Sequence, residues 1–281
     1  MNKALLKSLL ILIAAAGLLM AFGYHLTTQY GQAQPAAAAM VGSAADSLSR
    51  AVGRAVDNVA FGVGERLCFD IGYGFINAGT ATMEVLDVID YNGRPAYQIV
   101  STAQSNKFFS SFYPVNDRVE SIMDAVGLFS WRFQKTLREG GYRANQEYAI
   151  DQVKHAVVYN NDTITVAAYV QDALSALYFV RTQPLEVGQS VFVDNFTDGG
   201  NYPLEVRVYR REKVKIKAGE FNCLVVEPLL QTTGVFKHEG KLTVWLTDDR
   251  VRLPVLMKSK VVVGSISAEL TDYKLGRLEE F

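Results

Sequence analysis

The sequence predicts an all-β protein, built as an antiparallel, strongly curved sheet or a half-open β-barrel with one internal helix. Three observations carry this prediction. From residue 65 onward, short runs rich in β-branched and aromatic residues alternate with a period of two. Turn residues bound successive runs, which favours sequential antiparallel pairing. Only one segment of this region has a helical period, so the pattern of a parallel sheet with crossover helices is missing.

Fourteen runs in this region are predicted to be strands. They span residues 66–75, 80–89, 96–104, 118–126, 130–139, 142–150, 155–160, 163–169, 189–196, 202–217, 221–231, 241–247, 253–263 and 265–273. Asn92-Gly93 is the strongest hairpin signal among them, and the glycines within 138–143 supply a second turn. In the run 130–139, Arg132, Gln134 and Arg138 share one face, so that face is expected to be solvated.

A single helix is expected within residues 171–185. Asp172 is suited to cap its N-terminus, and Pro184 would stop it. Between them, four residues recur at helical spacing: Leu174, Leu177, Tyr178 and Arg181. The helix is predicted to plug or cover the sheet.

The N-terminus has the layout of an export signal. Lys3 and Lys7 precede an uncharged apolar run over residues 8–24, and Gly31 and Ala33 fit a cleavage site. The run is intermediate in length between a signal peptide and a membrane span, so residues 1–33 are expected to be either a cleaved signal peptide or a retained anchor in contact with the membrane. No cysteine lies near the cleavage site, so the lipid attachment motif of lipoproteins is missing.

Residues 34–64 are predicted to form an Ala-rich helical linker ahead of a β-barrel-like domain over 65–281. Apolar residues recur there at intervals of three or four: Met40, Ala44, Leu48, Val52, Ala55 and Val59. Such a helix would pack across the open end of the following domain, or dock on a partner or a membrane surface.

Composition and motifs exclude several classes of function. Basic and acidic residues nearly cancel, 28 against 29, so no global field would attract nucleic acid. Three isolated histidines, His25, His155 and His238, lack the second ligand at short spacing that zinc sites use, so no metal is expected. The chain also lacks a G-x-S-x-G elbow, a P-loop and a dinucleotide fingerprint, so no cofactor is expected.

The pair Asp248 and Asp249 is the one weak candidate for acid–base catalysis. Adjacent strand residues point to opposite faces, and Arg250 and Arg252 would keep both carboxylates ionised, whereas a general acid needs a raised pKa. The surrounding Thr-Asp-Asp composition is typical of a hairpin corner. A structural turn is therefore favoured over a catalytic site.

One segment has the composition of a binding feature. Four aromatic residues crowd into a stretch without clean alternation: Phe108, Phe109, Phe112 and Tyr113. They are interpreted either as a rim or lid for an apolar ligand, or as a core plug that closes the end of the barrel.

Cys68 and Cys223 are the only cysteines, and both lie in apolar strands. Their even number in an exported chain allows a disulfide, but two buried free thiols fit as well.

Three segments together resemble a bacterial exported family, domain of unknown function 3108. They are "LSALYFVRTQPLEVGQSV", "KAGEFNCLVVEP" and "GKLTVWLTDDRVRLPVLMKSKVVVGSISAELTDY". The resemblance covers residues 65–273 and implies an antiparallel β protein of the Gram-negative envelope, in the periplasm or anchored to the inner membrane. Its architecture is distantly similar to the open barrels of the lipoprotein carriers LolA and LolB, although a shared fold does not determine function.

Three functional hypotheses follow. The first is a non-enzymatic periplasmic carrier that holds a lipid or another apolar group on the concave face of the sheet, with the 108–113 aromatics as gate. The second is a structural or assembly factor of the cell envelope that meets a protein partner. The third, ranked last, is a hydrolase built on Asp248 and Asp249. Periodicity does not distinguish a filled barrel from an open one.

Overall fold

The computed structural model describes residues 53–159, 162–197, 199–230, 242–260 and 264–281. Within them fourteen strands form one antiparallel sheet, and all fourteen predicted runs correspond to its strands. The strands of the sheet are β1 (Arg66–Tyr73), β2 (Ile76–Tyr91), β3 (Arg94–Ser105), β4 (Asn116–Asp124), β5 (Ser130–Glu139), β6 (Tyr142–Asp151), β7 (Ala156–Tyr159), β8 (Asp162–Thr165), β9 (Ser190–Val193), β12 (Leu204–Ile216), β13 (Gly219–Leu230), β14 (Leu242–Thr247), β15 (Pro254–Lys260) and β16 (Ser265–Lys274). A separate small hairpin consists of β10 (Phe196–Thr197) and β11 (Gly200–Asn201).

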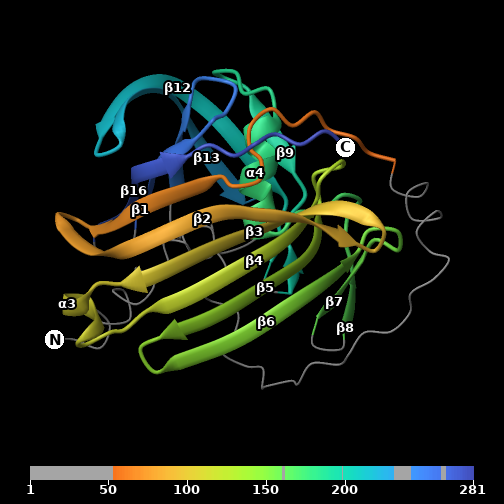
Figure 1. The fold of residues 1–281 in the computed structure, drawn as a ribbon, viewed down its shortest axis with the longest axis horizontal. Coiled ribbons are helices and arrows are strands. Elements are labelled where there is room, and N and C mark those ends of the chain that lie inside the picture. Colours follow the sequence, from red (N-terminus) through yellow and green to blue (C-terminus); the bar gives the residue numbers. More distant parts are fainter. Residues whose placement is uncertain (1–52, 160–161, 198, 231–241, 261–263) are drawn as a thin grey trace.

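The order of strands shows that the sheet does not close into a barrel. It runs β8-β7-β6-β5-β4-β3-β2-β1-β16-β15-β14-β13-β12-β9, so the first and last strands of the chain pair in the middle. From β1 the chain proceeds by hairpins to the edge strand β8, crosses to the other edge at β9, and returns to β16. The two edges are not paired with each other, and the result is a strongly curved open sheet (Figure 1).

The predicted hairpin signals form tight turns. Asn92 and Gly93 have left-handed φ angles of 56° and 79°, between the paired residues Tyr91 and Arg94. Such angles are required at both central residues of a type I′ turn, which explains the Asn-Gly sequence. Glu139 likewise pairs with Tyr142 across the two glycines of the second turn.

The internal helix α4 (Ala173–Thr182) begins and ends where the sequence indicates. Asp172 is its N-cap, and the helix ends at Gln183, before Pro184. Eight of its ten residues are buried, because the helix lies inside the curve between the two halves of the sheet (Figure 1). It belongs to the connection between the edge strands β8 and β9, and it packs against β4.

The core is the concave face of the sheet together with the helix. Alternate residues of each strand point inward, as in the buried series Leu67, Phe69 and Ile71 of β1. One apolar cluster joins both halves of the sheet to α4. A second, smaller cluster comprises Ala96, Ile122, Phe129 and Trp131.

The helix predicted for residues 34–64 is wrong in the part that the structure describes. Residues 53–64 contain no helix, and the remainder lies outside the described residues. The Val56 amide donates to the Val126 carbonyl, and the Arg54 guanidinium donates to the carbonyls of Gly127 and Leu128. These contacts hold the segment in a non-helical form, because tertiary hydrogen bonds outweigh a weak helical preference.

Candidate ligand-binding site

The aromatic segment that the sequence leaves as a loop contains a one-turn helix, α3 (Lys107–Ser110). Asn106 explains where the helix begins, because its Oδ1 accepts a hydrogen bond from the Phe109 amide at 2.9 Å. The same side chain donates from Nδ2 to the Asn77 carbonyl at 2.7 Å, and the Asn106 amide donates to the Ala78 carbonyl. Asn106 therefore ties α3 to the start of β2.

The structure divides the four predicted aromatics into an inward and an outward pair. Phe109 and Tyr113 are buried in the main core cluster, with Phe109 only 4% exposed. Phe108 and Phe112 point outward and are 66% and 44% exposed. The rings of Phe108, Phe109 and Phe112 contact one another, with centroids 5.3–5.5 Å apart. The segment is thus both a plug of the core and an exposed rim.

Sequence reasoning missed two residues of this rim. Phe75 is fully exposed at the β1–β2 turn, and Ile76 beside it is also exposed. Both lie at the same end of the sheet as α3, at the left of Figure 1. We call the four residues Phe75, Ile76, Phe108 and Phe112 the aromatic rim. The strand pattern did not indicate that Phe75 is exposed, because a single aromatic residue next to a glycine is typical of the end of a strand.

The turn between β5 and β6 lies beside the inward pair. Gly140 has a φ of 54°, and a Cβ at this position would overlap the Tyr113 ring. Only glycine satisfies both conditions. The Gly-Gly turn therefore serves to let Tyr113 lie flat against the end of the sheet.

A buried polar group on the inner face of β4 and β5 was also missed. Asp117, Lys135 and Glu139 are all buried, although each belongs to a residue type that is rarely buried. Oδ1 of Asp117 accepts a hydrogen bond from the Arg138 amide at 2.7 Å. Burial raises the pKa of Asp117, and hydrogen bonds from the Arg138 amide and with the Glu139 side chain offset part of that rise.

Replacing Asp117 by asparagine is expected to alter how stability depends on pH. The raised pKa means that the folded protein holds a proton at pH values where the unfolded chain has lost it. The wild type should therefore lose stability as the pH rises from the ordinary aspartate pKa through the raised one. Asp117→Asn should remove this loss, because the amide keeps the acceptor for Arg138 without a charge.

Urea unfolding across this pH range would measure the effect. Asp162→Asn, which removes an exposed carboxylate from the edge strand β8, is the control. Parallel pH profiles of wild type and Asp117→Asn would contradict the assignment.

Asp248 and Asp249 lie in the turn between β14 and β15, and their contacts are those of a hairpin corner. Oδ1 of Asp249 accepts three hydrogen bonds of 2.8–2.9 Å, from Thr247 Oγ1, Val251 N and Arg252 N. Asp248 instead pairs with Arg211 Nε at 2.7 Å on the surface. The two carboxylates thus have separate structural partners.

The cysteines and histidines do not come together in the described part of the chain. Cys68 on β1 and Cys223 on β13 are both free thiols, so the disulfide alternative is not realised. Burial raises the pKa of Cys223 to about 12, which keeps it protonated and unreactive. His155 lies in the β6–β7 turn, whereas His25 and His238 fall outside the described residues. Among the described residues, no cluster of three metal-ligating side chains occurs.

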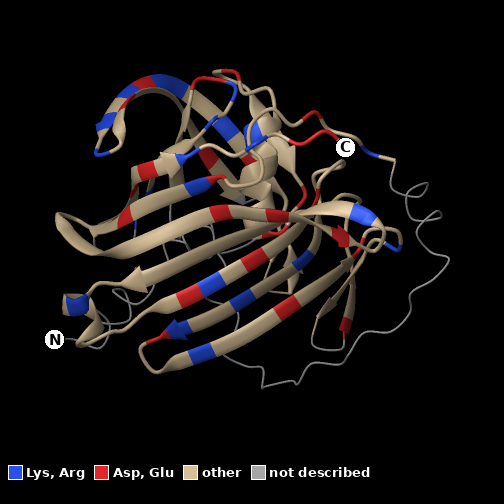
Figure 2. Cartoon of the chain, in the orientation of Figure 1, with Lys and Arg blue, Asp and Glu red and all other residues tan. Residues whose placement is uncertain are grey.

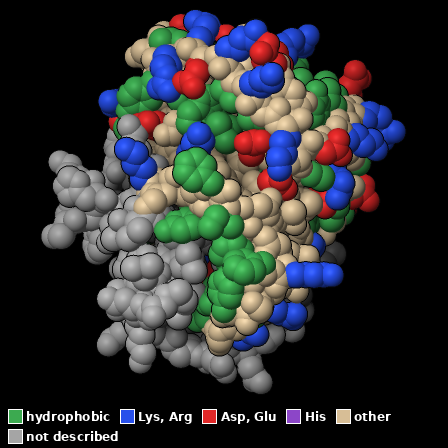
Figure 3. All heavy atoms as spheres, turned by 90° about the vertical axis from the view of Figure 1, so that its left-hand side faces the viewer, with side chains coloured by type: hydrophobic (Ala, Val, Ile, Leu, Met, Phe, Trp, Pro, Cys, Tyr) green, Lys and Arg blue, Asp and Glu red, His purple; other side chains and the backbone are tan. Residues whose placement is uncertain are grey.

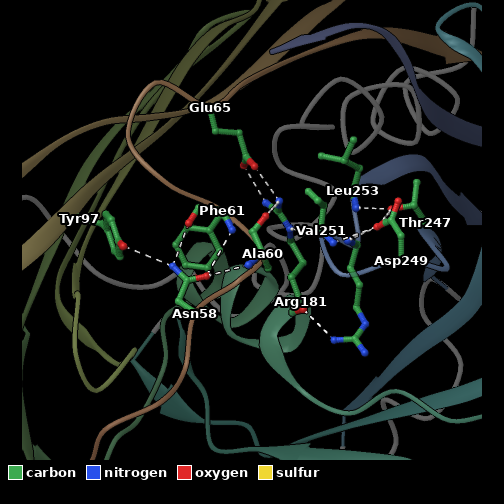
Figure 4. Close-up of polar contacts among 11 residues, drawn as sticks. Asn58, Ala60, Phe61, Glu65, Tyr97, Arg181, Thr247, Asp249, Val251 and Leu253 are labelled. Atoms are coloured by element: carbon green, nitrogen blue, oxygen red, sulfur yellow. Dashed lines mark hydrogen bonds and ion pairs between the residues drawn. The ribbon is translucent and has the colours of Figure 1, made fainter. Parts of the chain in front are cut away.

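A buried ion pair joins α4 to the start of the sheet (Figure 4). Arg181 binds Glu65 through two hydrogen bonds of 2.7 Å, and both side chains are fully buried. Arg181 also donates to the carbonyls of Ala60 and Val251, so four of its five N–H donors are engaged. Burial, together with the charge of the Glu65 carboxylate, raises the pKa of neighbouring Tyr178 well above its ordinary value. This network has no exposed atoms in Glu65 or Arg181 and fixes the helix within the sheet.

Neither helix in the described residues is long and apolar enough to cross a membrane. The apolar run over 8–24 and the predicted cleavage site lie outside the described residues.

One solved structure with a TM-score above 0.5 supports the fold, and others match with lower scores. A β-barrel-like protein of domain of unknown function DUF1849 from Brucella abortus matches with a TM-score of 0.51 and 11% identity, over 77% of this chain and 99% of that one. A protein described as exported, with a YmcC-like fold, from Bacteroides fragilis matches with a TM-score of 0.31 and 13% identity, over 78% of this chain and 99% of that one. A protein described as a lipoprotein, from Parabacteroides distasonis, matches with a TM-score of 0.35 and 11% identity, over 78% and 100%.

The search of curated proteins found no match. The sequence pattern of one family, described as "Protein of unknown function (DUF3108)", matches residues 68–271. This range runs from β1 to β16 and includes α3, α4 and the polar group at Asp117. The chain therefore belongs to the DUF3108 family, and the matched residues contain the curved open sheet and the internal helix of this chain.

Proposed function

We propose that the protein is a non-enzymatic carrier or binding module that holds a lipid or another apolar group on the concave face of its sheet, in the periplasm. The observation that carries the proposal is the aromatic segment at the end of that face. Two of its rings point into the apolar core and two point out to solvent, which is the arrangement expected of a gate.

The open topology supports the same proposal. The edge strands β8 and β9 are not paired, so the two halves of the sheet can separate slightly without breaking a ladder of backbone hydrogen bonds. A closed barrel would need to break such a ladder to admit a large ligand. The concave face carries aliphatic and aromatic side chains from both halves, and the apolar residues of α4 pack among them.

Export follows from the N-terminal layout. The basic residues and the apolar run over 8–24 direct the chain to the secretory pathway, whether or not the segment is later removed. The periplasm is an aqueous compartment in which an apolar molecule needs a protein that shields it from water.

A bound molecule should be detectable directly. We expect native mass spectrometry of the full chain, purified gently from a bacterial envelope, to show a reproducible added mass that organic solvent releases and that identifies the lipid class. A clean mass for the protein alone, with no uptake of lipids added from detergent micelles, would contradict the carrier proposal. It would favour an envelope assembly factor that uses the unpaired edges of β8 and β9 to meet a protein partner.

Two neighbouring phenylalanines offer a matched pair of variants for the gate. Phe109→Leu replaces an inward-pointing aromatic ring by a smaller aliphatic side chain. Phe108→Leu makes the same replacement at an outward-pointing ring. We expect Phe109→Leu to speed the exchange of bound lipid in micelles by about tenfold, as for loss of part of a buried aromatic contact. Phe108→Leu should leave this exchange rate unchanged. Equal rates in the two variants would show that the inward ring is not a gate.

A further inference from the structure

Exposed apolar side chains gather at one end of the molecule. The aromatic rim, Phe75, Ile76, Phe108 and Phe112, belongs to the β1–β2 turn and α3. Figure 3 faces this end and shows hydrophobic side chains collected in a continuous strip. Exposed apolar residues scattered singly are ordinary, but a contiguous group of large ones marks a surface of interaction.

The rim is held firmly, so its exposure is built into the fold. Asn106 caps α3 through its Oδ1, and its Nδ2 and backbone amide join the helix to β2. The hydroxyls of Ser105 and Ser110 are 2.7 Å apart, which closes the helix onto the end of β3. The outward ring of Phe108 is braced edge-on against Phe112 at 5.3 Å. A rigid apolar tip loses little conformational entropy when it binds.

The exposed charges in the described loops around the rim have one sign. Three such loops, residues 73–77, 106–114 and 138–143, carry the exposed cations Lys107, Arg138 and Arg143. The only acidic residue of these three loops is Glu139, which is buried. Over the strands elsewhere, basic and acidic residues are interspersed (Figure 2), in line with a net charge of −1. The three described loops therefore present an excess of exposed cations beside the rim.

We propose that this end docks on the surface of an anionic lipid bilayer. Phe75, Ile76 and the two outward rings of α3 would enter the interfacial layer, and the three cations would face lipid phosphates. Aromatic and aliphatic residues flanked by lysine and arginine are the combination that binds such interfaces. A protein partner would need complementary carboxylates, and nothing in the rim itself selects for their spacing.

The inference concerns a different event from the proposed carriage of a ligand. It requires the outer surface of the rim, not the concave face, and it would hold for a protein that carries nothing. If both proposals are right, docking would place the inward pair Phe109 and Tyr113 next to the lipids from which a ligand is taken.

Quenching by lipids with brominated acyl chains would test the docking in the full chain. The variant Phe108→Trp places an indole in the rim, and Phe192→Trp places one on β9 at an exposure of 67%, against 66% for Phe108. Wild-type Trp131 and Trp245 are buried and supply a constant background. The two variants share the same N-terminal run, so any attachment through that run affects both equally.

With vesicles of phosphatidylethanolamine and phosphatidylglycerol, we expect strong quenching in Phe108→Trp and little in Phe192→Trp. Pure phosphatidylcholine vesicles should quench the rim indole less. Adding Lys107→Gln to the rim variant should raise the lipid concentration needed for half-maximal quenching by about fivefold, the effect of one cation near an anionic surface. Lys154→Gln, in the β6–β7 turn at the other end of β6, should not change it.

Equal quenching of the two indoles, or of the rim indole on anionic and neutral vesicles, would overturn the proposal. So would a rim indole that is shielded by self-association or by a bound protein instead of by lipid. Loss of docking with a bound lipid mass still present would remove only this inference, whereas docking without any bound mass would remove only the carrier function.

Discussion

Replacing Arg181 by methionine is expected to lower the free energy of unfolding by about 3–5 kcal/mol, because it leaves the Glu65 carboxylate buried without its counterion. Burial alone would lower the pKa of Arg181, but the charge of Glu65 and its hydrogen bonds raise it above the ordinary value. Arg181 therefore stays charged in the folded protein. Without Arg181, the desolvation cost of the buried Glu65 carboxylate is no longer offset by an opposite charge.

Denaturant unfolding, followed by tryptophan fluorescence, would measure this loss. Arg210→Met is a matched control, since Arg210 forms an ion pair with Glu212 on the exposed face of β12. Its loss should cost less than about 1 kcal/mol, as for other surface pairs. A cost for Arg181→Met as small as that of the control would show that the buried network does not stabilise the helix in the sheet.

The double variant Glu65→Leu with Arg181→Met separates charge from packing. An apolar pair of similar volume often replaces a buried ion pair at little cost. We expect the double variant to be more stable than Arg181→Met alone, although it has one more substitution. A double variant less stable than the single one would instead indicate that the carbonyl contacts to Ala60 and Val251 matter more than the charge balance.

The second large effect is expected at Asp172, the N-cap of α4. Its Oδ1 accepts from the amides of Leu174 and Ser175, at 2.7 and 2.8 Å. Its Oδ2 accepts from two serine hydroxyls at 2.5 Å, those of Ser121 on β4 and Ser130 on β5. Burial raises the pKa of Asp172, and these four hydrogen bonds oppose the rise. One side chain thus caps the helix and binds it to two strands.

Asp172→Ala should lower the free energy of unfolding by about 2–4 kcal/mol, the cost of a lost cap together with buried donors left without an acceptor. Asp151→Ala is the control, because Asp151 also accepts from two backbone amides, those of Val153 and Lys154, but at the surface. At the surface these amides can bond to water, so Asp151→Ala should lower the free energy of unfolding by only about 0.5–1 kcal/mol. Similar losses at the two positions would mean that the serine contacts contribute nothing.

Local sequence patterns predicted the strands and turns well because the information for them is local. The alternation of apolar and polar residues along a strand indicates which side chains face the core. A type I′ turn requires residues that tolerate positive φ, as Asn92 and Gly93 do. The cap at Asp172 was predictable for the same reason. Its carboxylate accepts from the backbone amides two and three residues later in the chain, so the arrangement depends only on neighbouring residues. The pairing of β1 with β16 was not, because it joins residues about two hundred positions apart.

The candidate site was only partly predictable. The aromatic segment was visible from its composition, but which rings point inward depends on the turn of helix that Asn106 caps. Phe75 joined the rim only through the contact between α3 and the β1–β2 hairpin. The inward positions of Lys135 and Glu139 follow from the alternation along β5, yet their charge argued for the solvated face.

The sequence by itself thus determined the all-β class, the strands, the internal helix with its cap and most turns, since each depends on neighbours along the chain. Tertiary structure decided that residues 53–64 contain no helix, that the sheet stays open around α4, and that four apolar side chains form one exposed rim. These features depend on contacts between segments distant in sequence. Their energies arise from burial and hydrogen bonding between partners that no local pattern specifies.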